Sequence, residues 1–119
     1  MSANVLISHP TQAARHIAGK PPLSYVHLPS FAPMAYVLEF GAQKYERDNW
    51  QKGSPVTQLL DCLMRHIAEL QDGKDIDEES GQLIVGHIQA NAMFIGHTVL
   101  NHPELDDRVK IKKGNTDAS

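Results

Sequence analysis

Apolar residues recur at helical spacing in three stretches of this chain. The first stretch runs from Ser30, a residue that can cap a helix, to about Tyr45, and Pro33 falls where a first turn tolerates proline. Its apolar positions are Phe31, Met34 or Ala35, Leu38 and Ala42. The segment 46–55 that follows is rich in Asp, Asn, Gly and Pro, and it predicts a loop.

A second helix is predicted from about Thr57 to Gln71, with Gly73 stopping it. Its apolar stripe consists of Leu59, Leu60, Leu63, Met64, Ile67 and Leu70. An acidic connection, 72–77, leads to a third helix that we expect to open with Asp77 as its cap and to end before Pro103. The expected core face of this helix is Ile84, Ile88, Ala92, Ile95 and Val99.

The two flanks lack such a pattern. Residues 1–29 contain the run 19–22 (Gly-Lys-Pro-Pro) and Pro29, which predict an extended arm lying on the body, with two helical turns at 11–18. The tail 112–119 is polar and is expected to fray. No strand with alternating polarity is apparent. We therefore predict an all-α protein, a compact bundle of three main helices in a single domain (30–111), which buries further apolar surface by self-association.

Composition narrows the function classes. The chain has 119 residues, 41% hydrophobic and 21% charged, which is typical of one globular domain. No apolar run approaches bilayer length, and the first ten residues predict no secretory signal. Eleven Lys and Arg against fourteen Asp and Glu argue against duplex nucleic acid as a partner. One cysteine, Cys62, excludes an internal disulfide and fits a reducing cytoplasm.

Polar residues beside the apolar stripes predict an interhelical pocket. Glu79, Leu83, His87 and Asn91 follow one another every four residues, so a helix over this range would place them on one face. Asp61, Arg65 and Glu69 form a second such row, next to His66. Carboxylates suit Mg²⁺, which in turn holds phosphates. The alternatives are helix capping by the acidic triplet 77–79, a solvated salt-bridge row, and hydrogen-bonded core histidines.

The loop 44–52 combines cations with aromatic side chains. Lysine and arginine can neutralise phosphates, whereas Tyr45 or Trp50 can stack on a base. The alternative is that Trp50 only plugs the end of the bundle.

The order of these fragments resembles a known family. The run 41–45 (Gly-Ala-Gln-Lys-Tyr), then 49–53 (Asn-Trp-Gln-Lys-Gly), Arg65-His66, Gly73, and Asp77 leading into 79–81 (Glu-Ser-Gly) resemble the phage dATP/dGTP diphosphohydrolases, with His87 and Asn91 beyond. That family is related by analogy to the all-α MazG-like pyrophosphohydrolases. The resemblance implies packed helices, a homo-oligomer (dimer or tetramer), Mg²⁺, a purine deoxynucleotide cut into monophosphate and pyrophosphate, and the host cytoplasm.

Residue roles follow from the same resemblance. It implies that Glu79 and His66 are catalytic. The implied metal ligands are Asp77, Glu79, His87 and Asn91, and the implied substrate-binding residues are Lys44, Tyr45, Asn49, Trp50, Lys52 and Arg65.

The chain departs from the family pattern in three ways. Ile84 stands where the family usually has histidine, Glu46 stands where it usually has glycine, and the dense carboxylate pairs of MazG-like enzymes are absent from the sequence. Two further hypotheses therefore stay open. One is a protein that sequesters a signalling nucleotide without cutting it, and the other is a helical interaction module with no ligand.

Overall fold

The computed structural model describes residues 6–9, 12–16 and 18–110 of the chain. Its elements are, in order, β1 (Leu6–His9), β2 (Gln12–His16), the 3₁₀ helices η1 (Leu23–Tyr25) and η2 (Leu28–Phe31), α1 (Ala32–Lys44), η3 (Asn49–Lys52), α2 (Val56–Gln71), α3 (Ile84–Asn101) and η4 (Pro103–Leu105). The predicted all-α fold of three main helices is confirmed, and the first two helices lie within two residues of their expected bounds. None of the described helices is long and apolar enough to cross a bilayer.

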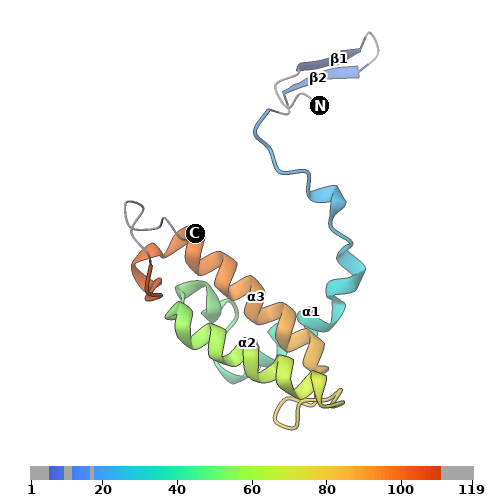
Figure 1. Ribbon diagram of the computed structural model, residues 1–119. Helices are drawn as coiled ribbons and strands as arrows, with labels where there is room; N and C mark the ends of the chain where they lie inside the picture. Colours follow the sequence, from blue (N-terminus) through green and yellow to red (C-terminus); the bar gives the residue numbers. More distant parts are fainter. Residues whose placement is uncertain (1–5, 10–11, 17, 111–119) are drawn as a thin grey trace.

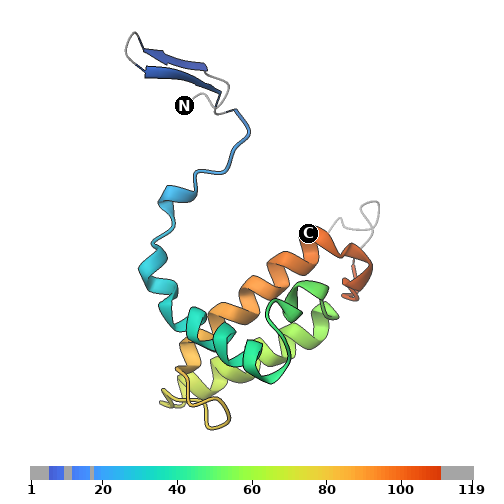
Figure 2. The ribbon, with the colours of Figure 1, turned by 180° about the vertical axis from the view of Figure 1, so that it is seen from behind.

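The core lies where the three helices meet. Helices α2 and α3 run side by side, and α1 crosses at one end of them (Figures 1 and 2). Each helix contributes apolar side chains to this small core, whose buried members are Val37, Val56, Leu59, Ile84 and Ala90. Because α2 has only two helices to pack against, much of its apolar surface lies outside the core.

A glycine sets the approach of α1 to α3. A Cβ atom on Gly86 would lie 2.5 Å from the carbonyl oxygen of Pro33 and 3.0 Å from a methyl group of Val37. Only a residue without a side chain permits this contact. The small residue at this position therefore brings the two helices close together.

The C-terminal segment caps the start of α2. The carboxylate of Asp107 accepts hydrogen bonds from the backbone N–H of Thr57 at 2.9 Å and from its hydroxyl at 2.6 Å. Pro55, at the cap position itself, makes no side-chain cap. Asp107 thus satisfies a free donor of the helix terminus from 50 residues away.

The third helix begins at Ile84, so the prediction that Asp77 caps it was wrong. The segment 76–83 is a turn closed by a bridge between Ile76 and Leu83, in which Asp77 N–H donates to the Gln82 carbonyl. Gly81 takes a positive φ of 70°, which a helix does not permit. Consequently Glu79 and Leu83 do not share a helical face with His87 and Asn91.

The N-terminal segment differs from its prediction in two ways. Residues 12–16, which we expected to be helical, form strand β2, because they pair with the antiparallel strand β1 through hydrogen bonds. Thr11, Ile17 and the predicted tail 112–119 lie outside the described residues. The arm also projects from the body and does not lie on it (Figures 1 and 2). The radius of gyration is accordingly 19.0 Å, against about 13 to 14 Å for a compact chain of this length.

Part of the expected core is on the surface. Met64, Ile67 and Leu70 of α2 are exposed, and so are Ala92 and Val99 of α3. The predicted helical spacing of the apolar residues is correct. In a bundle of only three helices, however, each helix has too few neighbours to cover both edges of its apolar stripe. The result is an uncovered apolar face on α2.

Candidate functional site

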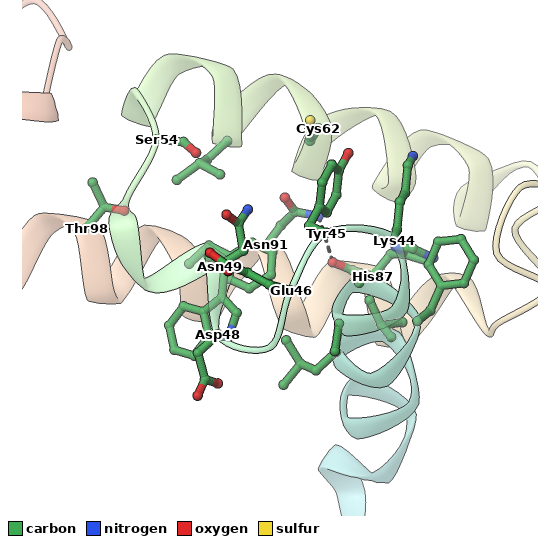
Figure 3. A pocket seen from close by; sticks show the side chains of 18 of the residues that line it. Lys44, Tyr45, Glu46, Asp48, Asn49, Ser54, Cys62, His87, Asn91 and Thr98 are labelled. Carbon is green, nitrogen blue, oxygen red and sulfur yellow. Dashed lines mark hydrogen bonds between the residues drawn. The ribbon is translucent and has the colours of Figure 1, made fainter.

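A cavity of about 420 Å³ lies between the three helices and the segment 46–54. This volume lies within the range of small-molecule sites. The residues that line the cavity come from the end of α1 (Lys44, Tyr45), from α2 (Cys62) and from α3 (His87, Asn91), as Figure 3 shows. The remaining wall comes from the loop that follows α1 and from Glu79 in the turn before α3.

One region of the cavity carries a single ion pair. Lys44, the last residue of α1, donates to Glu79 Oε2 at 2.9 Å, although 35 residues separate the two in sequence. This hydrogen bond raises the pKa of the Lys44 ammonium, and the negative charge of Glu79 adds to the effect. The ammonium also lies 5.4 Å from the centre of the Tyr45 ring. Cation and carboxylate therefore face the same cavity.

The other region is aromatic. The indole of Trp50 stacks on Phe94 of α3, with ring centres 5.4 Å apart, and meets the edge of His97 at 5.1 Å. His97 and His102 both hydrogen-bond to the carbonyl of Gln51 and so fix the loop that carries the indole. Trp50 thus packs against the bundle and also lines the cavity.

A buried hydroxyl also lines the cavity. Thr98 is 1% exposed, and its Oγ1 has no hydrogen-bond partner within the described chain. Since buried polar atoms are almost always paired, such an atom marks a place where a ligand can bond. Thr98 and Trp50 belong to the same cavity, so a polar atom is available near the aromatic wall.

The cavity wall is backed by a polar network around His87. Its Nε2 lies 2.7 Å from the Ser80 hydroxyl and 3.6 Å from Asp77 Oδ2, and the Asn91 amide donates to its carbonyl. Burial lowers the pKa of His87 despite the negative charge of Asp77. Burial alone would raise the pKa of Asp77, but hydrogen bonds from Ser80 and the two nearby imidazoles outweigh it and leave the pKa lowered.

A second cluster lies behind this wall. The ring of His66 stacks on His87, with centres 4.8 Å apart. His66 Nδ1 is 2.9 Å from Glu69 Oε1, and one ligand atom each of His66, Glu69 and Asp77 fall within 4.8 Å of one another. These three residues could hold a metal ion, and none of them is among the lining residues of the cavity.

The cavity brings together most of the residues to which the resemblance gave roles. It is lined by Lys44, Tyr45, Asn49, Trp50, Glu79, His87 and Asn91. The other predicted residues lie elsewhere in the described chain. Lys52 pairs with Glu46, Arg65 is exposed on α2, and Asp77 and His66 belong to the second cluster.

Four residues with a place in these sites were not singled out for a role by the sequence. Phe94 and Thr98 follow Asn91 on α3 at helical spacing, and that spacing was the available signal. Ser80 was noticed only inside a motif, and Glu69 was assigned to a row with Arg65. Its actual partner is His66, which a spacing of three residues on α2 also allowed.

Comparison with known proteins decides the family. A family model described as "dATP/dGTP diphosphohydrolase, N-terminal" matches residues 10–108. The chain belongs to this family. The resemblance drawn from the sequence is thereby confirmed.

A similar protein is known from a phage. The "dATP/dGTP diphosphohydrolase" of Salmonella phage PMBT28 is 41% identical to this chain over 90 residues. The match covers 76% of this chain but 31% of the relative, so the chain spans about a third of that protein's length. No solved structure matches the chain.

Proposed function

We propose that this family member binds a purine deoxynucleoside triphosphate in the cavity and hydrolyses it to the monophosphate and pyrophosphate. The observation that carries the proposal is the pairing of two chemistries in one cavity. A cation and a carboxylate, Lys44 and Glu79, meet at one part, and an aromatic wall with an unpaired hydroxyl forms another. A nucleotide needs both kinds of surface.

In this proposal the phosphates of the nucleotide replace Glu79 as the binding partner of Lys44. The Lys44 side chain is 43% exposed and its ammonium bonds to one oxygen of Glu79, so a phosphate can replace that carboxylate without disturbing the fold. The base then lies against Trp50, with Asn49 on the same loop, and Tyr45 lies beside the ammonium that holds the phosphates. Thr98 Oγ1 is available to a polar atom on the edge of the base.

Release from Lys44 frees Glu79 for chemistry. A water oxygen attacks the α-phosphorus, and the bond from that phosphorus to the α–β bridging oxygen breaks. Pyrophosphate leaves with the bridging oxygen, while Glu79 accepts the proton of the water. His66, which we also predicted to be catalytic, contacts the ring of His87 from behind the cavity wall and would act by positioning it.

The family points to a divalent metal, and we propose Mg²⁺ in the cavity. Mg²⁺ is usually held by one or two carboxylates together with substrate phosphates. The donors present fit this pattern, because Glu79 offers a carboxylate in the cavity that the predicted ligand Asn91 also lines, whereas His87 Nε2 is occupied by Ser80. When bound, the ion neutralises phosphate charge and lowers the pKa of water.

The second candidate is sequestration without hydrolysis. The observation that favours it is that the three carboxylates lining the cavity, Glu46, Asp48 and Glu79, are each paired with a lysine or arginine, which leaves none of them free to hold a metal ion. A sequestering protein would depend on Lys44 more than on Glu79.

The test incubates the protein with dATP or dGTP, with and without Mg²⁺, and separates products by anion exchange. We expect monophosphate and pyrophosphate only with the metal. Glu79→Gln should lower turnover by about a hundredfold or more, as loss of a general base does. Glu78→Gln, at the neighbouring exposed carboxylate, is the matched control and should keep full turnover.

Either of two results would decide against hydrolysis. Intact nucleotide that elutes with the protein would support sequestration. Nucleotide that is neither cut nor retained would remove both candidates and leave a helical interaction module.

We propose, further, that the protein works as a homo-oligomer in the cytoplasm of a host bacterium. The uncovered apolar face of α2 supports the first part, and the Salmonella phage relative supports the second.

A further inference from the structure

The cluster of His66, Glu69 and Asp77 is separate from the nucleotide cavity. His66 and Glu69 lie one turn apart on α2, and Asp77 reaches them from the turn that precedes α3. Their ligand atoms lie within 4.8 Å of one another, close enough to surround one ion. The cavity is lined by other residues, so the proposed function uses only His66 of this cluster, as a positioning residue, and leaves Glu69 and Asp77 without a role.

The backbone holds Asp77 firmly in this position. Its N–H donates to the Gln82 carbonyl, and its own carbonyl accepts from the N–H of Gly81. One carboxylate oxygen, Oδ2, accepts from the N–H of Ser80, which orients the group. Three independent hydrogen bonds for one residue give the cluster a ligand that is already positioned.

The charges of the cluster are poorly balanced without a cation. The side chains of Asp77 and Glu69 are 15% and 30% exposed, and within the described residues neither forms an ion pair with a lysine or arginine. Their partners are His87 and His66, which are charged only when protonated. Two partly buried carboxylates this close together are costly unless a positive charge lies between them.

The donor atoms indicate the kind of cation. Imidazole nitrogen together with carboxylate oxygen suits first-row transition metals, whereas Mg²⁺ prefers oxygen donors alone. The side chain of His66 is 10% exposed, so its nitrogen is shielded from competing water. The stacked ring of His87, held by Ser80, supports Asp77 from the far side.

We propose that His66, Glu69 and Asp77 bind a divalent transition-metal ion, Zn²⁺ or Mn²⁺, in preference to Mg²⁺. The ion links the turn 76–83 to α2 and so stiffens the wall that carries Glu79 and His87. Metal binding here needs no nucleotide and uses residues that do not line the cavity, so a titration without nucleotide tests it separately from the proposed function.

The test is metal titration of the chelator-treated protein by calorimetry, with ZnCl₂, MnCl₂ and MgCl₂ in turn and no nucleotide. We expect Zn²⁺ or Mn²⁺ to bind at one equivalent and to raise the melting temperature, and Mg²⁺ at the same concentration to do neither. His66→Gln should weaken binding by about a hundredfold or more, since the loss of a supporting outer residue alone typically costs 10- to 100-fold.

Two further variants make the result specific. Glu69→Gln alters a side chain that is 30% exposed, so this variant should fold normally, and it should weaken binding in the same way as His66→Gln. His27→Gln removes an exposed histidine on the arm and should leave binding unchanged. The proposal fails if no ion binds, if Mg²⁺ binds as tightly as Zn²⁺ and Mn²⁺, or if binding survives both cluster variants.

Discussion

The Lys44–Glu79 pair is the residue-scale feature on which the proposed site depends. It joins the end of α1 to the turn before α3, two segments that the sequence separates by 35 residues. Exposed pairs of this kind contribute little to stability, with a median of about 0 to 1 kcal/mol. The pair is therefore free to exchange with a ligand, and its two members can be altered without unfolding the protein.

Removal of the Lys44 ammonium should weaken nucleotide binding. Lys44→Met keeps the aliphatic stem but loses a charged hydrogen bond, worth about 1.5 to 3 kcal/mol, so the KM for dGTP should rise roughly tenfold to a hundredfold. Steady-state kinetics measures this change. Lys74→Met, at an exposed lysine of the connection after α2, is the control, and an equal effect in both variants would contradict the assignment.

His87 should make stability depend on pH. Burial lowers the pKa of His87 below the ordinary value of 6.5. Between the folded pKa and 6.5, the folded state therefore binds fewer protons than the unfolded state. Its contribution is present above pH 6.5 and is lost as the pH falls through the folded pKa. Urea unfolding should give a lower free energy of unfolding at pH 5.5 than at pH 7.5. This difference should be smaller in His87→Gln and unchanged in His27→Gln. An unchanged decrease in His87→Gln would contradict this.

The residue roles came from the order of motifs, and the structure explains why patterns alone could not supply them. Glu79 and His87 do line one cavity, but a turn brings them together and not the helical face that their spacing suggested. The partner of Glu69 was missed because two residues on α2, Arg65 and His66, were both within reach along the helix.

At the scale of elements, local signals predicted what local forces determine. The positions of proline and glycine residues predicted the bounds of α1 and α2 to within two residues. The start of α3 depends on a bridge between Ile76 and Leu83, and β2 depends on pairing with β1. In both cases the pairing residues lie in different segments of the chain. The periodicity of a single segment therefore could not reveal them.

Two glycines of α3 make a matched test of the helix packing. Gly86→Ala would place a Cβ 2.5 Å from a backbone oxygen of α1 and should cost about 1 to 3 kcal/mol. A Cβ on Gly96 would meet nothing within 4 Å, so Gly96→Ala should stabilise by about 0.5 to 1 kcal/mol. Urea denaturation of both variants measures the difference. Equal effects would show that α1 does not pack against α3 at Gly86.

At the scale of the whole molecule, apolar surface is left uncovered. Met64 is 62% exposed and Ile67 is 45% exposed, and they lie three residues apart on α2. A projecting arm and a thin bundle bury less surface than a compact chain of this length would. The sequence predicted the need for a partner, but it did not show which face the partner would cover.

This face should mediate self-association. We expect light scattering after size exclusion to give a dimer or tetramer at micromolar concentration. Ile67→Glu should shift it toward monomer, because a buried charge disrupts an apolar contact. Arg65→Glu, at an exposed position beside it, is the charge control. A strict monomer for the unaltered chain would contradict the proposal.

Occupation of the cavity by a purine nucleotide can be followed through the fluorescence of Trp50, the only tryptophan of the chain. The protein would be titrated with a non-hydrolysable dGTP or dATP analogue in the presence of Mg²⁺. We expect saturable quenching as the base stacks near the indole, with weaker binding in Lys44→Met and unchanged binding in Lys74→Met. Emission that does not change with nucleotide, or that changes equally in both variants, would contradict this expectation.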